Sequence, residues 1–262
     1  MDFTLKKYML LLETLISNGY CFQTFKDFLE KPHDGKTIIL RHDVDLKPEN
    51  SLATARIENE LGIEASYYFR AVPESWDEDI IKKTAALGHE IGYHYESLTT
   101  TNGDIDEAYN DFVKNLDKLK SLLNSSNSSN SCLTICMHGS PRSPYDSKDI
   151  WKRYSYKELN IIGEPYFDMD FSKAFYLTDT GRRWDGYNVS VRDKIHAYQD
   201  EWTKKGLIFH KTDDIIKAAN AGDFPHVVMI TTHPQRWTDD GLSWMKEYFF
   251  QNIKNVVKFF CC

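Results

Sequence analysis

Short apolar runs alternate with amphipathic helical segments along most of this 262-residue sequence. Runs typical of buried strands cover residues 37–40, 65–69, 90–94, 133–137 and 227–231. Parallel strands need this alternation, because between two strands the chain returns to the same end of the sheet, usually through a crossover helix. The pattern therefore predicts an α/β fold with a parallel sheet or barrel.

The helical segments have recognisable ends. A helix over residues 4–18 carries apolar residues every three or four positions, and Gly19 is placed to end it. We expect this helix to pack outside the sheet. Further helices are predicted over 48–61, 77–87 and 105–123, from Asp213, and from Asp239. The last of these is expected to turn one apolar set inward, namely Leu242, Met245, Phe249, Ile253 and Val256.

Length and organisation favour one domain over residues 1–262. The run of only Asn and Ser over residues 124–131 is predicted to be a flexible surface loop inside it. Residues 139–200 read as irregular and rich in aromatic side chains. Segments of that length commonly form the wall of an enzyme site.

Charge and cysteine content bound the partners and the compartment. The formal net charge of −7 argues against a nucleic acid or an anionic membrane as the partner, because both need a basic face. No apolar run is long enough to cross a bilayer. The five cysteines are sparse and odd in number, and Glu13 interrupts the first apolar stretch, unlike a signal peptide. These features predict a cytoplasmic protein.

Polar residues capable of chemistry stand where the predicted strands end. In parallel α/β folds these ends share one face of the molecule, which holds the site. Crowded acids and imidazoles there are costly to bury unless a cation compensates them. The residues at these positions are Asp43, Asp45, His94, His138 and His233.

The individual signals differ in strength. Asp43 and Asp45 are two residues apart, so on a strand both carboxylates face one side, although such a pair can also be two solvated loop acids. His89 and His94 are five apart, which puts them on opposite faces of a strand, so at most one binds a metal. We expect His94 to be the ligand and His89 to be structural. No nucleophile elbow, phosphate loop or dinucleotide fingerprint is present.

Three segments in this order resemble the polysaccharide deacetylases with a NodB-homology domain, carbohydrate esterase family 4, and in particular members from polysaccharide biosynthesis clusters. They are His42-Asp43-Val44-Asp45, Gly88-His89-Glu90-Ile91-Gly92-Tyr93-His94 and Thr232-His233, and they span most of the chain. The resemblance implies a distorted (β/α)7-type barrel and a metal-dependent deacetylase. By the same resemblance Asp43 is the general base, Asp45 and His94 are metal ligands, and His233 is the general acid.

One departure from the family pattern concerns the metal. The family's second histidine lies four residues after the first, where this chain has Leu98. Either His138, from the next strand end, or Glu96 is then expected to complete the site. Imidazole and carboxylate ligands with an open position suit Zn²⁺ first, and also Co²⁺, Mn²⁺ or Ni²⁺.

The resemblance also implies a substrate, an N-acetylated sugar or glycan. Asp179 and Trp184 are matched loosely to the family's Asp/Trp segment, which orients the acid and lines the pocket. With Arg236 and Trp237 they are assigned to substrate binding. A set of aromatic residues either stacks on sugar rings or packs in the core: Tyr145, Trp151, Tyr154, Trp184 and Trp237. Two other functions stay open. Leu98 favours a carbohydrate-binding pseudoenzyme without metal, and a closed pocket would favour a hydrolase of small cyclic amides.

Overall fold

The computed structural model describes residues 1–125, 131–140, 143–188, 190 and 193–261, and their side chains up to residue 256 with the exception of Tyr187. Seven strands form its single described sheet: β1 (Cys21–Gln23), β2 (Thr37–Val44), β3 (Ser66–Phe69), β4 (Glu90–Tyr95), β5 (Ile135–Met137), β6 (Phe175–Thr178) and β7 (Val227–Thr232). Predicted strands over 37–40, 65–69, 90–94, 133–137 and 227–231 are thus confirmed.

All strand pairs in the sheet are parallel, in the order β5-β4-β3-β2-β7-β6. Strands β1 and β3 share one edge of β2: β1 pairs with its first half and β3 with its second half. The sheet is curled, and no ladder between β5 and β6 closes it among the described residues. The predicted α/β class with a distorted (β/α)7-type barrel is confirmed.

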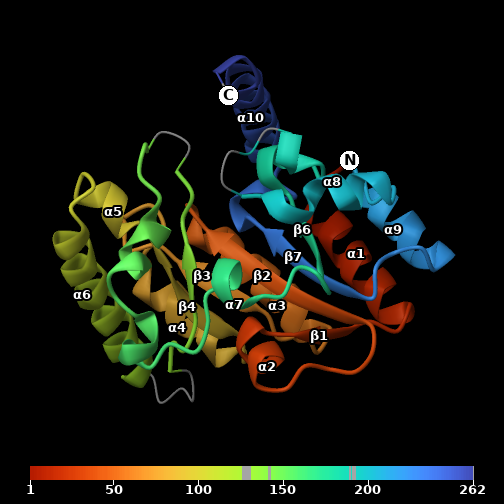
Figure 1. Cartoon of the computed structure of the whole chain (residues 1–262). Helices are drawn as coiled ribbons and strands as arrows, with labels where there is room; N and C mark the ends of the chain where they lie inside the picture. The colour runs from red at the N-terminus through yellow and green to blue at the C-terminus, as the bar shows by residue number, and fades with distance from the viewer. Residues whose placement is uncertain (126–130, 141–142, 189, 191–192, 262) are drawn as a thin grey trace.

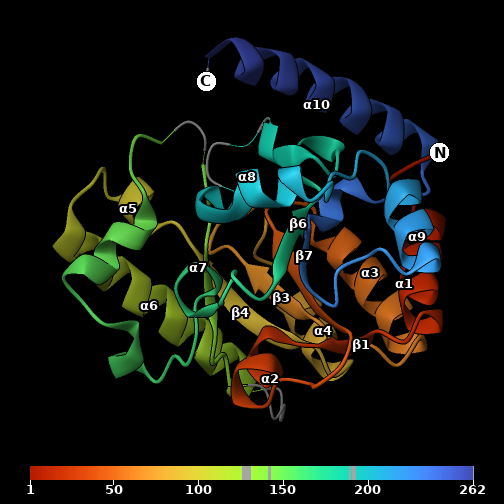
Figure 2. The same ribbon diagram turned by 45° about the vertical axis from the view of Figure 1, so that its right-hand side comes forward.

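Helices cover the sheet and join its strands (Figures 1 and 2). The α-helices are α1 (Leu5–Ser17), α2 (Phe25–Glu30), α3 (Pro48–Glu60), α4 (Glu78–Ala86), α5 (Ser97–Thr100), α6 (Ile105–Asn124), α7 (Pro165–Asp168), α8 (His196–Lys204), α9 (Thr212–Ala221) and α10 (Gly241–Cys261). Five of them pack side by side in the order α9, α1, α3, α4, α6. Short 3₁₀ turns complete the chain: η1 (Ser147–Lys152), η2 (Tyr156–Leu159), η3 (Thr180–Arg182), η4 (Gly186–Asn188) and η5 (Pro234–Arg236).

Side chains alternate across the central strand β2, and this alternation positions the site. His42 faces the helices, where its Nε2 lies 2.8 Å from Glu58 Oε1 of α3. Arg41 and Asp43 face the opposite side of the sheet and pair with each other. The two sides of β2 therefore hold two separate buried polar groups, and the one with Asp43 adjoins His94 at the end of β4.

Some elements were not predicted or were predicted wrongly. Strands β1 and β6 and helices α7 and α8 lie in segments for which no regular structure was expected. The apolar set of the last helix, predicted to face inward, is exposed instead. Residues 126–130 of the predicted Asn/Ser loop lie outside the described residues. Within the described part, no helix is both long and apolar enough to cross a membrane.

Candidate metal centre

Three side chains from three strand ends converge on one point. Asp45 follows β2, His94 lies in β4 and His138 follows β5. Asp45 Oδ1 lies 3.1 Å from His138 Nδ1 and 3.6 Å from His94 Nε2. The two ring nitrogens are 3.3 Å apart. The structure therefore brings together two of the predicted ligands and His138, one of the two candidates for the third.

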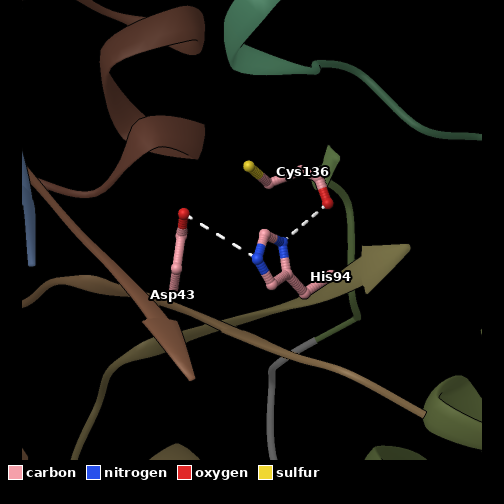
Figure 3. A group of neighbouring side chains, drawn as sticks. All are labelled: Asp43, His94 and Cys136. Carbon is pink, nitrogen blue, oxygen red and sulfur yellow. Dashed lines mark hydrogen bonds and ion pairs between the residues drawn. The ribbon is translucent and has the colours of Figure 1, made fainter. Parts of the chain in front are cut away.

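The His94 ring is held by a backbone contact that turns its other nitrogen toward this point. Its Nδ1 lies 2.9 Å from the carbonyl oxygen of Cys136, so Nδ1 carries the proton and donates it. Figure 3 shows the ring between Asp43 and Cys136, with Nδ1 aimed at that carbonyl oxygen and not at the sulfur. His94 Nε2 is left with a lone pair, as in metal-binding histidines whose second nitrogen is fixed by a carbonyl.

The spacing of the three atoms fits a tetrahedral ion. Zinc with ligands about 2.0–2.1 Å away in a tetrahedron places neighbouring ligand atoms about 3.3 Å apart. The observed separations of 3.1, 3.3 and 3.6 Å lie on either side of that value. Asp45 Oδ1 is shielded from solvent and, within the described residues, accepts no well-aligned hydrogen bond. A cation held at this point would compensate the charge of this carboxylate.

A second group of possible ligands, Asp43, His94 and Cys136, fits a metal less well. Both Asp43 oxygens already accept hydrogen bonds from Arg41, at 2.9 and 2.8 Å, and Arg41 is fully buried. The guanidinium charge beside this group repels a further cation. Burial also raises the pKa of the Cys136 thiol well above its usual value, which disfavours the thiolate that metals bind.

Glu96, the other candidate for the third ligand, is engaged elsewhere. Its two oxygens accept hydrogen bonds from Arg70 Nε and Nη2 at 2.8 and 2.9 Å. Its Oε2 lies 3.8 Å from His138 Nε2, on the far side of that ring from Asp45. Glu96 thus stands behind His138, and the geometry favours His138 as the ligand.

Leu98, which occupies the place of the family's second histidine, does not face the site. It lies in α5, is 3% exposed, and packs with Ala108 and Ile150 in a small apolar cluster. This cluster is separate from the main core. The helical turn α5 therefore buries the side chain at this position.

His233 stands beside the metal centre at the end of β7. Its Nδ1 lies 2.6 Å from Asp179 Oδ1 and its Nε2 lies 3.9 Å from Asp45 Oδ2. Asp179 is fully buried and also accepts hydrogen bonds from Arg236 Nη1 at 2.6 Å and Trp237 Nε1 at 2.8 Å. The Asp179 carboxylate fixes the His233 ring so that Nε2 faces the centre.

The surroundings of Asp45 and of His233 both favour the charged form of the side chain. Burial raises the pKa of Asp45, but His138, His94 and His233 outweigh it and hold that pKa well below its usual range. Burial and Arg236 lower the pKa of His233, whereas Asp179 and Asp45 raise it, and the net effect is a raised pKa. A carboxylate that stays ionised and an imidazole that keeps its proton are the states a metal ligand and a general acid need.

The residues predicted to bind substrate lie in the interior. Asp179, Arg236 and Trp237 are buried and bonded to one another or to His233. Trp184 is also buried, donates from Nε1 to Thr212 Oγ1, and packs against Phe3. The most exposed of these side chains, Arg236, is 10% exposed, and the assignment of the four residues to substrate binding stays a prediction.

The aromatic residues expected either to stack on sugars or to fill the core differ in their burial. Trp151 donates to the Tyr95 hydroxyl and packs on the core, and Tyr154 stacks on Tyr109. Tyr145 is exposed. His89 is structural, as expected: its Nε2 lies 2.9 Å from the Ala55 carbonyl oxygen in the interior.

Sequence reasoning missed three residues of the site. Arg41 pairs with Asp43, Arg70 Nη1 donates to the Asp45 carbonyl oxygen at 3.0 Å, and Gln235 Nε2 donates to Asp45 Oδ2 at 3.2 Å. Arg41 had a signal, because it lies two residues before Asp43 on one strand and so shares its face. Arg70 and Gln235 had none, because their approach to Asp45 depends on the tertiary fold.

Comparisons with known proteins find likeness in structure only. No protein-family model matches the chain, and no curated protein matches it in sequence. A CE4 family pseudoenzyme from Bacillus anthracis aligns with a TM-score of 0.43 and 12% identity over 86% of this chain and 62% of that one. A variant of it with restored enzymatic activity gives the same score and identity, covering 64% of its chain. This chain thus spans less than two thirds of their length.

A peptidoglycan N-acetylglucosamine deacetylase aligns with a TM-score of 0.42 and 15% identity, over 87% of this chain and 90% of that one. These neighbours include CE4 family members, the family that the sequence resembles. At such scores and identities the likeness says nothing about activity, so the function has to be argued from the site.

Proposed function

We propose that this protein is a metal-dependent hydrolase that removes the acetyl group from an N-acetylated sugar or glycan. The observation that carries the proposal is the convergence of Asp45 Oδ1, His94 Nε2 and His138 Nδ1 at separations of 3.1 to 3.6 Å. Zinc is the metal we expect there, with Co²⁺, Mn²⁺ or Ni²⁺ as alternatives. When bound, such an ion supplies an activated water and polarises the acetyl carbonyl.

Asp43 is proposed as the general base. Its carboxylate is held by two hydrogen bonds from the buried Arg41, and its Oδ2 lies 3.8 Å from His94 Nε2. The guanidinium compensates the burial of the carboxylate and fixes its plane. Asp43 is therefore positioned at the edge of the centre to accept a proton from the attacking water.

His233 is proposed as the general acid. Asp179 binds Nδ1 and sustains the raised pKa of the ring, so Nε2 can carry the proton given to the leaving amine. Arg236 and Trp237 bind Asp179 and not the open side of His233. In place of substrate binding, we assign these three residues to positioning the acid.

The sugar substrate and the cytoplasmic setting follow from the sequence resemblance and composition. The described cysteines Cys21, Cys132 and Cys136 are free thiols, which fits a reducing compartment. The runner-up function is a carbohydrate-binding pseudoenzyme on the same fold, favoured by the burial of Leu98 in the α5 cluster. The two differ in whether a metal is held.

The deciding experiment combines metal analysis with a deacetylation assay. Protein purified without chelators is analysed for bound divalent ions by mass spectrometry and assayed for acetate release from N-acetylated amino-sugar oligomers. We expect about one ion per chain and metal-dependent acetate release. Asp43→Asn should lose acetate release and keep the ion. Metal-free protein that still binds the oligomers would establish the pseudoenzyme instead.

A further inference from the structure

Helix α10 turns its apolar face away from the rest of the protein. Figure 2 shows it lying along the outside of the molecule, with its length clear of the sheet. Its apolar residues recur every three or four positions, so they form one stripe along the helix. Their exposed fractions range from 46% to 68%: Leu242, Met245, Phe249, Ile253 and Val256. Exposed apolar stripes of this kind mark interaction surfaces.

The opposite side of α10 is fixed to the body by polar contacts. Arg182 donates from Nη1 to the Trp244 carbonyl oxygen at 2.9 Å, and its guanidinium lies 4.4 Å from the Trp244 ring centroid. Asn255 donates to the Gly181 carbonyl oxygen at 2.8 Å. Gln251, between these contacts, is buried. These contacts, at Trp244 and at Asn255, hold the apolar stripe outward.

The charge of α10 is opposite to that of the whole chain. Its sequence holds Lys246, Lys254 and Lys258 against a single acid, Glu247, whereas the chain carries a net charge of −7. Aromatic residues are frequent in the same stretch, and the Lys246 and Lys254 side chains are exposed. The net charge of the whole chain does not reveal this local positive charge. For that reason the net charge by itself argued against an anionic membrane.

The position of Lys246 favours a lipid surface over a second copy of the chain as the partner of the apolar stripe. It is four residues after Leu242 and three before Phe249, so it lies on the apolar stripe itself. Pairing two such helices would press this ammonium group and its symmetry mate into an apolar interface, with no acid on the stripe to compensate them. At a bilayer surface the lysine stem lies along the apolar layer and its charge reaches the phosphates.

We propose that α10 is an interfacial helix that docks this protein onto the surface of an anionic membrane. The apolar stripe enters the boundary between headgroups and acyl chains, and the lysines bind anionic headgroups. The helix lies in the membrane plane and does not span it. Because Gly181 and Arg182 lie two and three residues after Asp179 in the chain, docking brings the rim with His233 close to the lipid surface.

Vesicle co-sedimentation of the full chain tests the proposal. We expect the protein to sediment with vesicles of phosphatidylcholine and phosphatidylglycerol in equal parts, to bind pure phosphatidylcholine far less, and to be released by salt. The double variant Phe249→Glu/Ile253→Glu should weaken binding by about tenfold or more. Leu10→Glu/Ile16→Glu places the same two charges at exposed positions of α1 and should bind like the wild type.

Three results would overturn the proposal. One is absence of sedimentation with the anionic vesicles, and another is equal binding to the neutral ones. The third is a wild-type dimer in light scattering that Phe249→Glu/Ile253→Glu converts to a monomer while vesicle binding is absent, which would assign the stripe to a second copy. Circular dichroism of each variant establishes that loss of binding is not loss of folding.

Discussion

The buried carboxyl group of Glu164 should make this protein less stable as the pH rises, which a carboxylate at the surface would not do. It precedes α7 and is fully buried. Its Oε1 accepts from the Met137 backbone N–H at 3.0 Å and its Oε2 from that of Tyr166 at 2.6 Å. Burial raises the pKa of Glu164 from 4.5 to about 7, against the opposing effect of these two hydrogen bonds and of Arg41 and Lys148.

The sign and size follow from linkage. The pKa is higher in the folded state, so the folded protein binds the proton more tightly than the unfolded chain. This contribution is complete below the unfolded pKa of 4.5 and is lost as the pH rises through about 7. The difference between 4.5 and about 7 corresponds to about 3 kcal/mol of unfolding free energy.

Urea unfolding followed by circular dichroism, at a series of pH values between these limits and above them, measures this change. In Glu164→Gln the side chain stays neutral, so its unfolding free energy should fall less as the pH rises, by about 3 kcal/mol across the range. Glu158→Gln removes one negative charge from the exposed turn η2 and is the control. Parallel curves for the wild type and Glu164→Gln would refute the reasoning.

Three further predictions concern the site. His138→Ala should weaken metal binding by at least about tenfold in calorimetric titration, and Leu98→His should not restore it in that background, because Leu98 faces the α5 cluster. Asp179→Asn should keep the metal and lower turnover about a hundredfold or more. Its rate should also decline from a lower pH, because Asp179 raises the pKa of His233. Arg41→Met leaves Asp43 buried and unpaired, and should cost about 3–5 kcal/mol in urea unfolding.

The strands and their parallel arrangement could be predicted because they depend on local pattern. Each buried strand is a short apolar run, and the helices between them have clear stop signals such as Gly19 and Gly62, both with positive φ. Strand β6 could not be predicted in this way. It lies between irregular segments and, among the described residues, pairs with β7 and through a single bridge with Asp185. No predicted helix next to it marks where the strand begins or ends.

The orientation of the apolar face of α10 could not be predicted from the spacing of its apolar residues. A spacing of three and four residues predicts that Leu242 and Phe249 share a face, and they do. It does not say which side of the helix meets the body. That choice is made by two contacts between residues distant in sequence, Arg182 with the Trp244 carbonyl oxygen and Asn255 with the Gly181 carbonyl oxygen.

The register between β4 and β5 decides which residue can complete the metal centre. His94 pairs with Cys136, whose carbonyl oxygen orients the His94 ring, and Tyr95 pairs with Met137. His138 is therefore the first residue beyond the ladder, and its backbone N–H donates to the Tyr95 carbonyl oxygen. The register between β4 and β5 thus positions both His94 and His138. The spacing of residues along the chain does not contain this information. The motif that resembles the known family gives one histidine, and the neighbouring strand supplies the other.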